Sequence, residues 1–274
     1  MAEARRRRDP SYVKLPLIAA TFGILGVLII LPLYQVFAQA FGNGVAAYWS
    51  KLTDSPETRH AIFLTLMVAP TAVMLNTVFG TIAAYTIARF RFPGRTVLVS
   101  LIDLPFSVSP VVAGLVLVLL YGKNAAVGGW LFEWGYQVIF APPGLVLATA
   151  FVTFPFVVRE LIPVLEANGA EEELAARSLG ASGRQMFFAV TLPNIKWGLL
   201  YGVILCNARA MGEFGAIYVV SGRITGQTDT MPLRIEKLYQ EYDTTGAMAI
   251  ASLLTFLSLV TLALKAWLET KLRR

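Results

Sequence analysis

Six long apolar segments divide this chain and restrict it to folds that cross a lipid bilayer. A helix needs about 20 apolar residues to cross roughly 30 Å of hydrocarbon. Stretches of that kind lie at about 15–38, 61–88, 97–121, 141–161, 197–221 and 244–267. The chain is 56% hydrophobic and only 15% charged, and its mean hydropathy is +0.64. The sequence therefore predicts an all-α polytopic membrane protein with six transmembrane helices.

Basic residues are distributed unevenly between the two sides of these segments. If the amino terminus is cytoplasmic, the inside segments hold 16 of the 23 lysines and arginines, and the outer loops hold six. Such a bias marks the cytoplasmic side. We therefore expect both termini in the cytoplasm, a basic tail at 1–14 and a transmembrane domain over 15–274. The net charge of +6 follows from this topology and from acidic lipid, so nucleic acid is not an expected partner.

The first segment has a second interpretation, as a secretory signal. Four arginines at 5–8 precede it, and the tripeptide 38–40 imitates a small-residue cleavage site. Its apolar region, 15–37, is longer than the roughly 7 to 15 residues of a signal core. We favour an uncleaved transmembrane helix.

The third segment carries residues that interrupt helices. Pro105, Pro110 and Gly114 lie within it and predict a broken or kinked helix. Membranes tolerate such breaks where protein or a water-filled cavity satisfies the freed backbone groups. The outer loops 39–60, 122–140 and 222–243 are rich in Gly, Pro, Trp and Tyr and can form short interfacial helices.

The polar run from Ala170 to Pro193 lies between two apolar segments. Three glutamates, 171–173, begin it and favour a helix start, because carboxylates complement the helix dipole. Gly180 has the position of a glycine just past a helix end. A second helical stretch, 182–190, follows, and Leu192-Pro193 is expected to stop it before the fifth segment. The pattern predicts a helix-turn-helix knuckle in a loop at about 162–196, suited to docking on a cytoplasmic protein.

These residues resemble the EAA loop of permease subunits in ATP-binding-cassette (ABC) importers. The resemblance is carried by Glu173, Ala175, Ala176, Gly180, Leu192 and Pro193. It implies that they, with Glu172, form a coupling helix that contacts an ATPase. One position departs from the pattern, because Leu174 stands where close relatives have Glu. The family's acidic contact is then expected from Glu173, at a different angle.

Two further stretches, 103–115 and 191–222, resemble permease subunits of sulfate and thiosulfate importers, and molybdate permeases are similar there. The resemblance implies the type I importer permease fold, a place in the bacterial inner membrane and ATP-driven transport by alternating access. It leaves sulfate, thiosulfate and molybdate or tungstate open as the anion. The implied partners are a second permease subunit, two copies of a cytoplasmic ATPase and an extracytoplasmic binding protein.

The sequence agrees with this division of labour. It contains no G-x-x-x-x-G-K-[ST] run, so ATP and Mg²⁺ are expected on the partner ATPase. We expect no cofactor or metal on this chain and no enzymatic activity. A secondary anion transporter is the main alternative, but such proteins usually place several carboxylates or histidines inside their spans. In the expected spans of this chain, the residues available for such a role are mainly Asp103 and Glu213. A channel would not need the docking knuckle.

Arg209 is the candidate residue for passage of the anion. It is expected about 20 Å into the fifth segment, where a cation is costly and usually functional. Glu213 follows at i+4, so a structural ion pair is the alternative. Gly212 and Gly215 permit close helix approach. Ser107 and Ser109 offer hydroxyl donors to an oxyanion.

Three single residues receive structural interpretations. Cys206, the only cysteine, lies in an apolar stretch and is expected to pack. His60, the only histidine, is expected at an interface on an outer loop edge. Asp103 is expected near the cytoplasmic boundary, capping a helix or pairing with a loop arginine.

Overall fold

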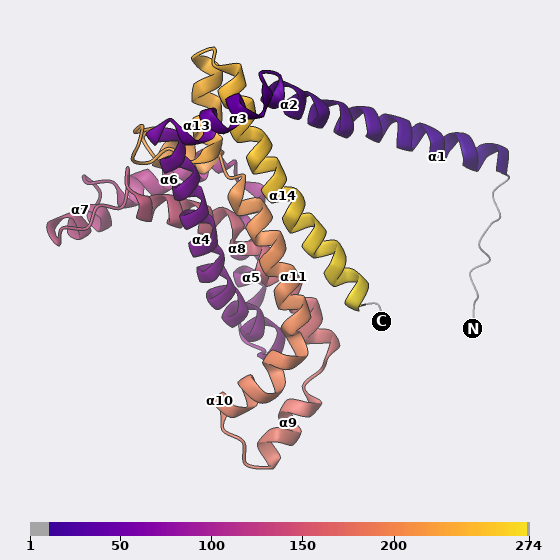
Figure 1. Cartoon of the computed structure of the whole chain (residues 1–274). Coiled ribbons are helices and arrows are strands. Elements are labelled where there is room, and N and C mark those ends of the chain that lie inside the picture. The colour runs from indigo at the N-terminus through magenta and orange to yellow at the C-terminus, as the bar shows by residue number, and fades with distance from the viewer. Residues whose placement is uncertain (1–10, 273–274) are drawn as a thin grey trace.

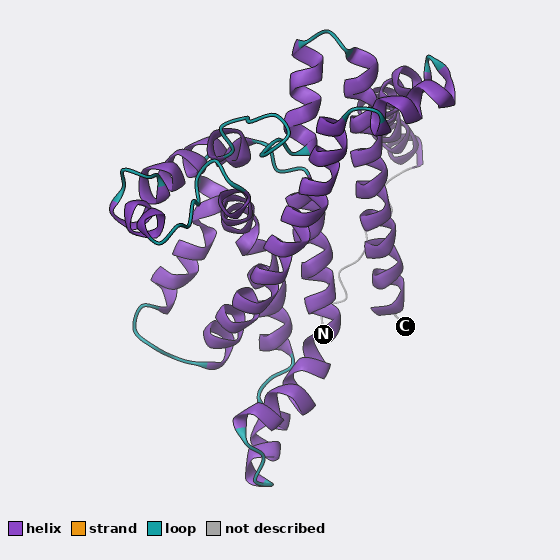
Figure 2. Ribbon diagram, turned by 60° about the vertical axis from the view of Figure 1, so that its left-hand side comes forward, coloured by secondary structure: helices purple, strands orange, loops and turns teal. Residues whose placement is uncertain are grey.

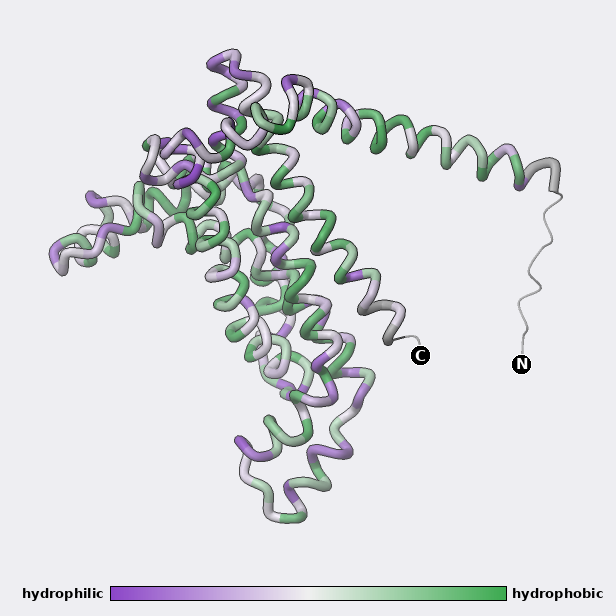
Figure 3. Tube along the Cα trace, viewed as in Figure 1, coloured by the Kyte–Doolittle hydropathy of each residue, from purple (hydrophilic) through white to green (hydrophobic). Residues whose placement is uncertain are grey.

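The computed structural model describes residues 11–272, and in this part of the chain every regular element is a helix (Figure 2). Five continuous helices are long and apolar enough to cross a membrane. They are Lys14–Phe41, Pro56–Arg89, Pro142–Ala167, Gly183–Met211 and Thr244–Trp267. A sixth span is a bent pair of helices. The all-α membrane fold expected from the sequence is confirmed, and Figure 3 shows the apolar positions along the helices between more polar ends.

The first part of the first span stands apart from the other helices (Figure 1). The span consists of α1 (Ser11–Leu25), a π-helical turn η1 (Gly26–Ile30) and α2 (Leu31–Phe41). None of the residues in its most apolar window is buried, and α2 packs against α14 (Thr244–Leu272). The predicted basic tail, 1–14, lies largely outside the described residues. α1 begins at Ser11, within the last four residues of that tail.

The core forms where α4 (Pro56–Arg89) and α11 (Leu192–Met211) pack on α8 (Pro142–Ala167). A buried polar group joins these three helices. The Asn76 amide donates to Thr153 Oγ1 at 2.8 Å, and its nitrogen lies 3.6 Å from Cys206 Sγ. Interhelical hydrogen bonds of this kind hold membrane helices together. Cys206 is fully buried, which confirms the prediction that it packs.

The third segment is broken, as its prolines predict. α5 (Arg95–Ser107) and α6 (Pro110–Tyr121) are bent by 112°. The loops at one end contain the expected short helices, α3 (Gly44–Thr53), α7 (Ala126–Glu133) and α13 (Met231–Gln240). Figure 1 places α3, α7 and α13 at one end of the bundle, and α9 (Glu171–Ser178) with α10 (Gly183–Met186) at the other. We name the second end the hairpin end.

The fifth span differs from the expected 197–221. α10, a π-helical turn η2 (Phe187–Thr191) and α11 form one helix that ends at Met211, and a separate helix α12 (Gly215–Val220) follows. The prediction that Leu192-Pro193 stops a helix was wrong. In the π turn the Leu192 N–H bonds the Phe187 carbonyl, and Pro193 then occupies the first turn of α11, where its missing N–H is tolerated.

Candidate functional site

The hairpin of α9 and α10 has well-defined turns. Gly180 has φ +88°, the left-handed conformation, and the Ala181 N–H bonds the Ala176 carbonyl at 3.0 Å. This is the expected glycine cap. Ser182 then begins α10, because its hydroxyl accepts from the Gln185 N–H while the Gln185 side chain accepts from the Ser182 N–H. Both ends of the connection are therefore closed by hydrogen bonds.

Glu173 fastens this hairpin to the membrane helices. Its carboxylate lies 3.1 Å from Arg89 Nη2 and accepts a hydrogen bond from the Thr191 hydroxyl at 2.9 Å. The Tyr85 hydroxyl donates to it at 3.3 Å, and Arg89 Nη1 donates to the Leu165 carbonyl at 2.7 Å. The network links α9 to the ends of α4 and α8 and to η2. It is a buried pair with extra hydrogen bonds, the arrangement that compensates for the desolvation of both charges.

The sequence placed Glu173 among the residues facing an ATPase, but the structure buries it, with 7% of its surface exposed. Consecutive residues of a helix point in different directions, so only one of the three glutamates at the start of α9 can face the bundle. That residue is Glu173, which faces Arg89. Its neighbour Glu172 is exposed and accepts a hydrogen bond from Asn194. We did not predict from the sequence that Arg89 and Tyr85 take part. Their position at the end of α4 is the one feature of the sequence that could have indicated it.

The outward face of the hairpin is apolar. Leu174 and Leu179 are 63% and 89% exposed, and Ala175 and Gly180 are exposed beside them. Leu174, the departure from the family pattern, therefore belongs to this face and does not replace the buried carboxylate of Glu173. Pro193 is exposed and Leu192 half-buried at the start of α11, away from this tip. Exposed leucines on an otherwise polar hairpin indicate a protein contact.

Two helix breaks lie side by side, one between α5 and α6 and the other between α11 and α12. A Cβ on Gly114 of α6 would lie 2.7 Å from the Ala216 carbonyl oxygen, and one on Gly215 would lie 2.9 Å from Pro110 Cβ. The two helices that follow the breaks thus pack backbone to backbone. Gly212 makes no such approach to another described residue, because a Cβ there would meet nothing within 4 Å.

Arg209 and Glu213 meet at the second break. Arg209 Nη1 lies 2.6 Å from Glu213 Oε2, without the alignment of a hydrogen bond, and Glu213 Oε1 accepts from the Ala216 N–H at 3.1 Å. The Glu213 side chain is fully buried, and 36% of the Arg209 side chain is exposed. Arg209 is in the last turn of α11, where the helix dipole favours a cation.

The remaining predicted polar residues of the third segment lie on either side of the first break. Ser107 ends α5 and Ser109 precedes α6, and both are exposed with no hydrogen-bond partner for their hydroxyls among residues 11–272. Asp103 pairs with Arg159 at 2.7 Å, so its partner is on α8 and not in a loop. Glu160, beside Arg159 on α8, also lies within a span. It is a third carboxylate, besides Asp103 and Glu213, that bears on the secondary-transporter alternative.

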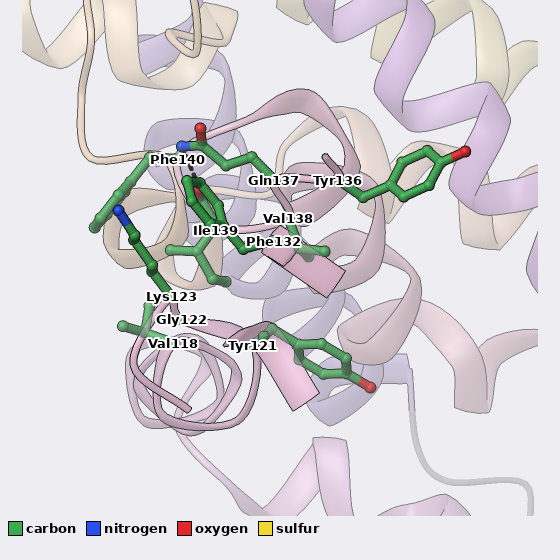
Figure 4. Close-up of a pocket in the computed structure, with 11 residues that line it drawn as sticks. Val118, Tyr121, Gly122, Lys123, Phe132, Tyr136, Gln137, Val138, Ile139 and Phe140 are labelled. Atoms are coloured by element: carbon green, nitrogen blue, oxygen red, sulfur yellow. Dashed lines mark hydrogen bonds between the residues drawn. The ribbon is translucent and has the colours of Figure 1, made fainter. Parts of the chain in front are cut away.

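A separate cavity of about 420 Å³ lies between the end of α6, α7 and the loop at 134–140 (Figure 4). Its lining is mainly apolar and aromatic, and Lys123 lies 4.3 Å from the centre of the Phe132 ring. Gln137 donates to the Ile139 carbonyl at 3.0 Å. Because few polar groups converge in it, this cavity is poorly suited to an oxyanion.

Within the described part of the chain, no group of three or more His, Cys, Asp and Glu residues is arranged to hold a metal ion. His60 lies near the start of α4 and is half-buried. Its Nδ1 has no hydrogen-bond partner among the described residues.

Comparisons with known proteins agree with this architecture. Residues 76–274 match the family described as "Binding-protein-dependent transport system inner membrane component". The chain is 54% identical over 245 residues to the sulfate transport system permease protein CysW of Escherichia coli K12, covering 89% of this chain and 84% of that protein. It is 40% identical over 236 residues to CysT of the same strain, covering 86% and 85%. A crystal structure of a bacterial ABC transporter involved in alginate import has the same fold, with a TM-score of 0.76, 17% identity and 96% of both chains covered.

Proposed function

Because the chain belongs to the family of inner membrane components of binding-protein-dependent transport systems, we propose that it is a permease subunit of an ATP-driven sulfate importer. The observation that carries this proposal is the 54% identity with a sulfate permease over most of both chains. Similarity to a second sulfate permease, at 40%, suggests that the partner subunit is a related chain and that the two form a heterodimer.

The hairpin end is the cytoplasmic end in this proposal, with both termini on that side. The basic residues of the inside segments support this orientation. ATP and Mg²⁺ then bind to two copies of a separate ATPase, since this sequence lacks a phosphate-binding loop. An energy source is required, because moving a dianion into a negative interior costs roughly 4.6 kcal/mol at 100 mV.

The apolar hairpin tip is the surface that docks on the ATPase. Leu174, Ala175, Leu179 and Gly180 form its outward face, and Ala176 and Glu172 flank it. The Glu173–Arg89 pair lies behind this face and ties it to α4 and α8. Movement of the ATPase is therefore transmitted to the membrane helices through a rigid contact. This linkage is how ATP-driven closure would switch the permease pair between outward-facing and inward-facing forms.

The paired helix breaks supply the polar surface for the anion in this scheme. The exposed hydroxyls of Ser107 and Ser109 face away from the packed core and can donate to an oxyanion. The Arg209–Glu213 pair serves mainly to join α11 to α12, because Glu213 is buried and also holds the first turn of α12. Arg209 is half-exposed and adds positive charge beside the path.

Uptake of labelled sulfate tests the proposal. A transport-deficient bacterial host would carry this gene with genes for the second permease, the ATPase and the binding protein, and a matched host would lack only this gene. We expect ATP-dependent sulfate uptake that disappears without this subunit and is reduced by excess thiosulfate. Uptake of molybdate but not sulfate by a correctly assembled complex would overturn the substrate and keep the importer.

A further inference from the structure

A basic cavity of about 440 Å³ lies at the hairpin end, where α4 and α8 end and α5 begins. Elements far apart in the sequence build it, because it also takes in the turn at 90–94 and the residue before α9. Its charged lining residues are Arg89, Arg91, Arg95 and Glu166. Since the apolar spans of α4 and α8 stop here, the cavity lies at the boundary between the hydrocarbon and the polar layer of the membrane.

The charges around this cavity do not cancel. Glu173, which is outside the lining, neutralises Arg89, and Glu166 pairs with Arg95 at 2.9 Å. Both side chains of the second pair are about half-exposed, so water weakens it. Arg91 is exposed and has no hydrogen-bond or ion-pair partner among residues 11–272. Three guanidinium groups against two carboxylates leave one positive charge, which is that of Arg91.

The lining also holds hydrogen-bond donors that have no acceptor. Arg95 donates from Nε to the Ile87 carbonyl at 2.9 Å and from Nη2 to Glu166, which fixes its guanidinium and leaves Nη1 without an acceptor among the described residues. Gly94 begins α5 without a side-chain cap, and the first turn of α5 has no acidic residue. The first N–H groups of a helix lack partners and form the positive end of its dipole. Together with Arg91, these donors suit an anion with several acceptor oxygens, such as a phosphate group.

An apolar groove adjoins this cavity. It has a volume of about 170 Å³ and lies between α5 and α8, and Ile87 belongs to both linings. Asp103 and Arg159 also line the groove, but they neutralise each other at 2.7 Å. The other residues of its lining are apolar: Val99, Ile102, Val158, Ile162 and Pro163. A molecule with an anionic head and a hydrocarbon chain therefore matches the cavity and the groove together.

We propose that the cavity binds the phosphate of an anionic phospholipid, with Arg91 and Arg95 as its main contacts and an acyl chain in the groove. Basic pockets between membrane helices bind anionic lipid head groups in this way. A lipid fits better than a soluble phosphate, because the cavity lies where the spans end and an apolar groove adjoins it. Arg89 belongs both to the lining and to the pair with Glu173, so the lipid lies where the hairpin joins the bundle.

The test is native mass spectrometry of the complete, delipidated complex titrated with phosphatidylglycerol. Arg91→Gln should raise the dissociation constant of one bound phosphatidylglycerol roughly tenfold, the effect of losing a charge-assisted hydrogen bond. Arg91→Lys keeps the charge without the planar fork and should fall between. The matched control is Arg184→Gln, an exposed hairpin arginine outside the lining, which should change the constant less than about twofold. An Arg91→Gln complex that binds as tightly as this control would overturn the proposal.

Two further ligands separate a lipid from other sources of phosphate. Phosphatidylcholine with the same acyl chains has the phosphate but no net charge, and glycerol phosphate has the charge but no chain. We expect the wild-type complex to bind each of them at least tenfold more weakly than phosphatidylglycerol. Equal binding of phosphatidylcholine would contradict the role of the arginine charge. Equal binding of glycerol phosphate would identify a site for soluble phosphate and overturn the lipid assignment.

A substitution in the groove tests the acyl chain and leaves every charge in place. Val99→Phe fills part of the groove and should weaken phosphatidylglycerol binding at least fivefold, with glycerol phosphate binding unchanged. Val97→Phe is the control, because Val97 is exposed on the same helix and lies outside both linings. Unchanged phosphatidylglycerol binding by Val99→Phe would show that no chain occupies the groove. None of these measurements involves transport, so their outcome is independent of the sulfate assignment.

Discussion

Arg89, at the last position of α4, lies 3.1 Å from the buried carboxylate of Glu173 in the hairpin, a residue 84 positions later in the chain. Arg89 also donates to the Leu165 carbonyl near the end of α8. One guanidinium thus holds the hairpin and two membrane helices in a single arrangement. The two side chains are only 11% and 9% exposed, so screening by water is weak there.

Loss of this pair should weaken both stability and coupling. Glu173→Gln leaves the Arg89 guanidinium buried and uncompensated, which costs about 3 kcal/mol. We expect a lower unfolding temperature of the purified complex and reduced ATP-dependent uptake. Glu171→Gln is the control, since Glu171 is exposed on the same helix. Equal behaviour of the two variants would contradict the role assigned to Glu173.

Gly180 should tolerate few substitutions. Its φ of +88° costs a branched side chain about 1–2 kcal/mol, and proline cannot adopt it. Gly180→Pro should abolish coupling of ATP hydrolysis to uptake while membrane insertion is preserved, and Gly180→Asn should be milder. Gly183→Ala is the control, because a Cβ there meets nothing within 4 Å. Normal uptake by Gly180→Pro would count against a rigid hairpin.

A double mutant distinguishes the two interpretations of Arg209. If Arg209 and Glu213 act as a structural pair, Arg209→Gln and Glu213→Gln each leave one charge unpaired, and the double variant should recover much of the lost uptake. If Arg209 acts on the anion itself, the double variant stays as defective as Arg209→Gln. Initial rates of sulfate uptake, corrected for the amount of complex in the membrane, provide the comparison.

The close packing of α6 on α12 predicts different outcomes for two glycines. Gly114→Ala places a Cβ 2.7 Å from a backbone oxygen, so α6 must move, at a cost of about 1–3 kcal/mol. Gly212→Ala, at the neighbouring break, meets no atom within 4 Å and should be tolerated. Thermal unfolding of the purified complexes measures the difference. Similar unfolding temperatures for the two variants would show that the two helices are not tightly packed.

The Lys51–Asp243 pair should make stability sensitive to acid. Burial raises the pKa of Asp243, but hydrogen bonds from Lys51 and the Gly246 N–H, with the charges of Lys51 and Arg234, lower the pKa overall to below 3.8. The ionised carboxylate therefore stabilises the folded state above that value, and the stabilisation is lost as the pH falls through the lowered pKa.

The comparison with Asp243→Asn isolates this effect. The unfolding temperature of the wild type should exceed that of the variant by a constant amount from pH 8 to pH 5. Below about pH 4 the difference should shrink, because the wild-type carboxyl also becomes neutral. A difference that grows as the pH falls would contradict the direction of the pKa change.

Local sequence patterns predicted several features that the structure confirms. The prolines of the third segment break it into α5 and α6, Gly180 caps α9, and short helices occupy the loops at one end. Each of these depends on the conformational preference of a residue and its immediate neighbours. The fifth span was mispredicted because the effect of Pro193 depends on the π turn before it and not only on the preference of proline itself.

The sequence by itself determined the class of fold, the number of apolar segments and the place of the hairpin, because hydrophobicity and backbone preference act over a few consecutive residues. Only the tertiary structure decided which glutamate is buried and which arginine pairs with it. Those outcomes depend on contacts between residues far apart in the chain. The direction in which a helix turns its side chains is set by packing against its neighbours, and no local pattern in a single sequence specifies it.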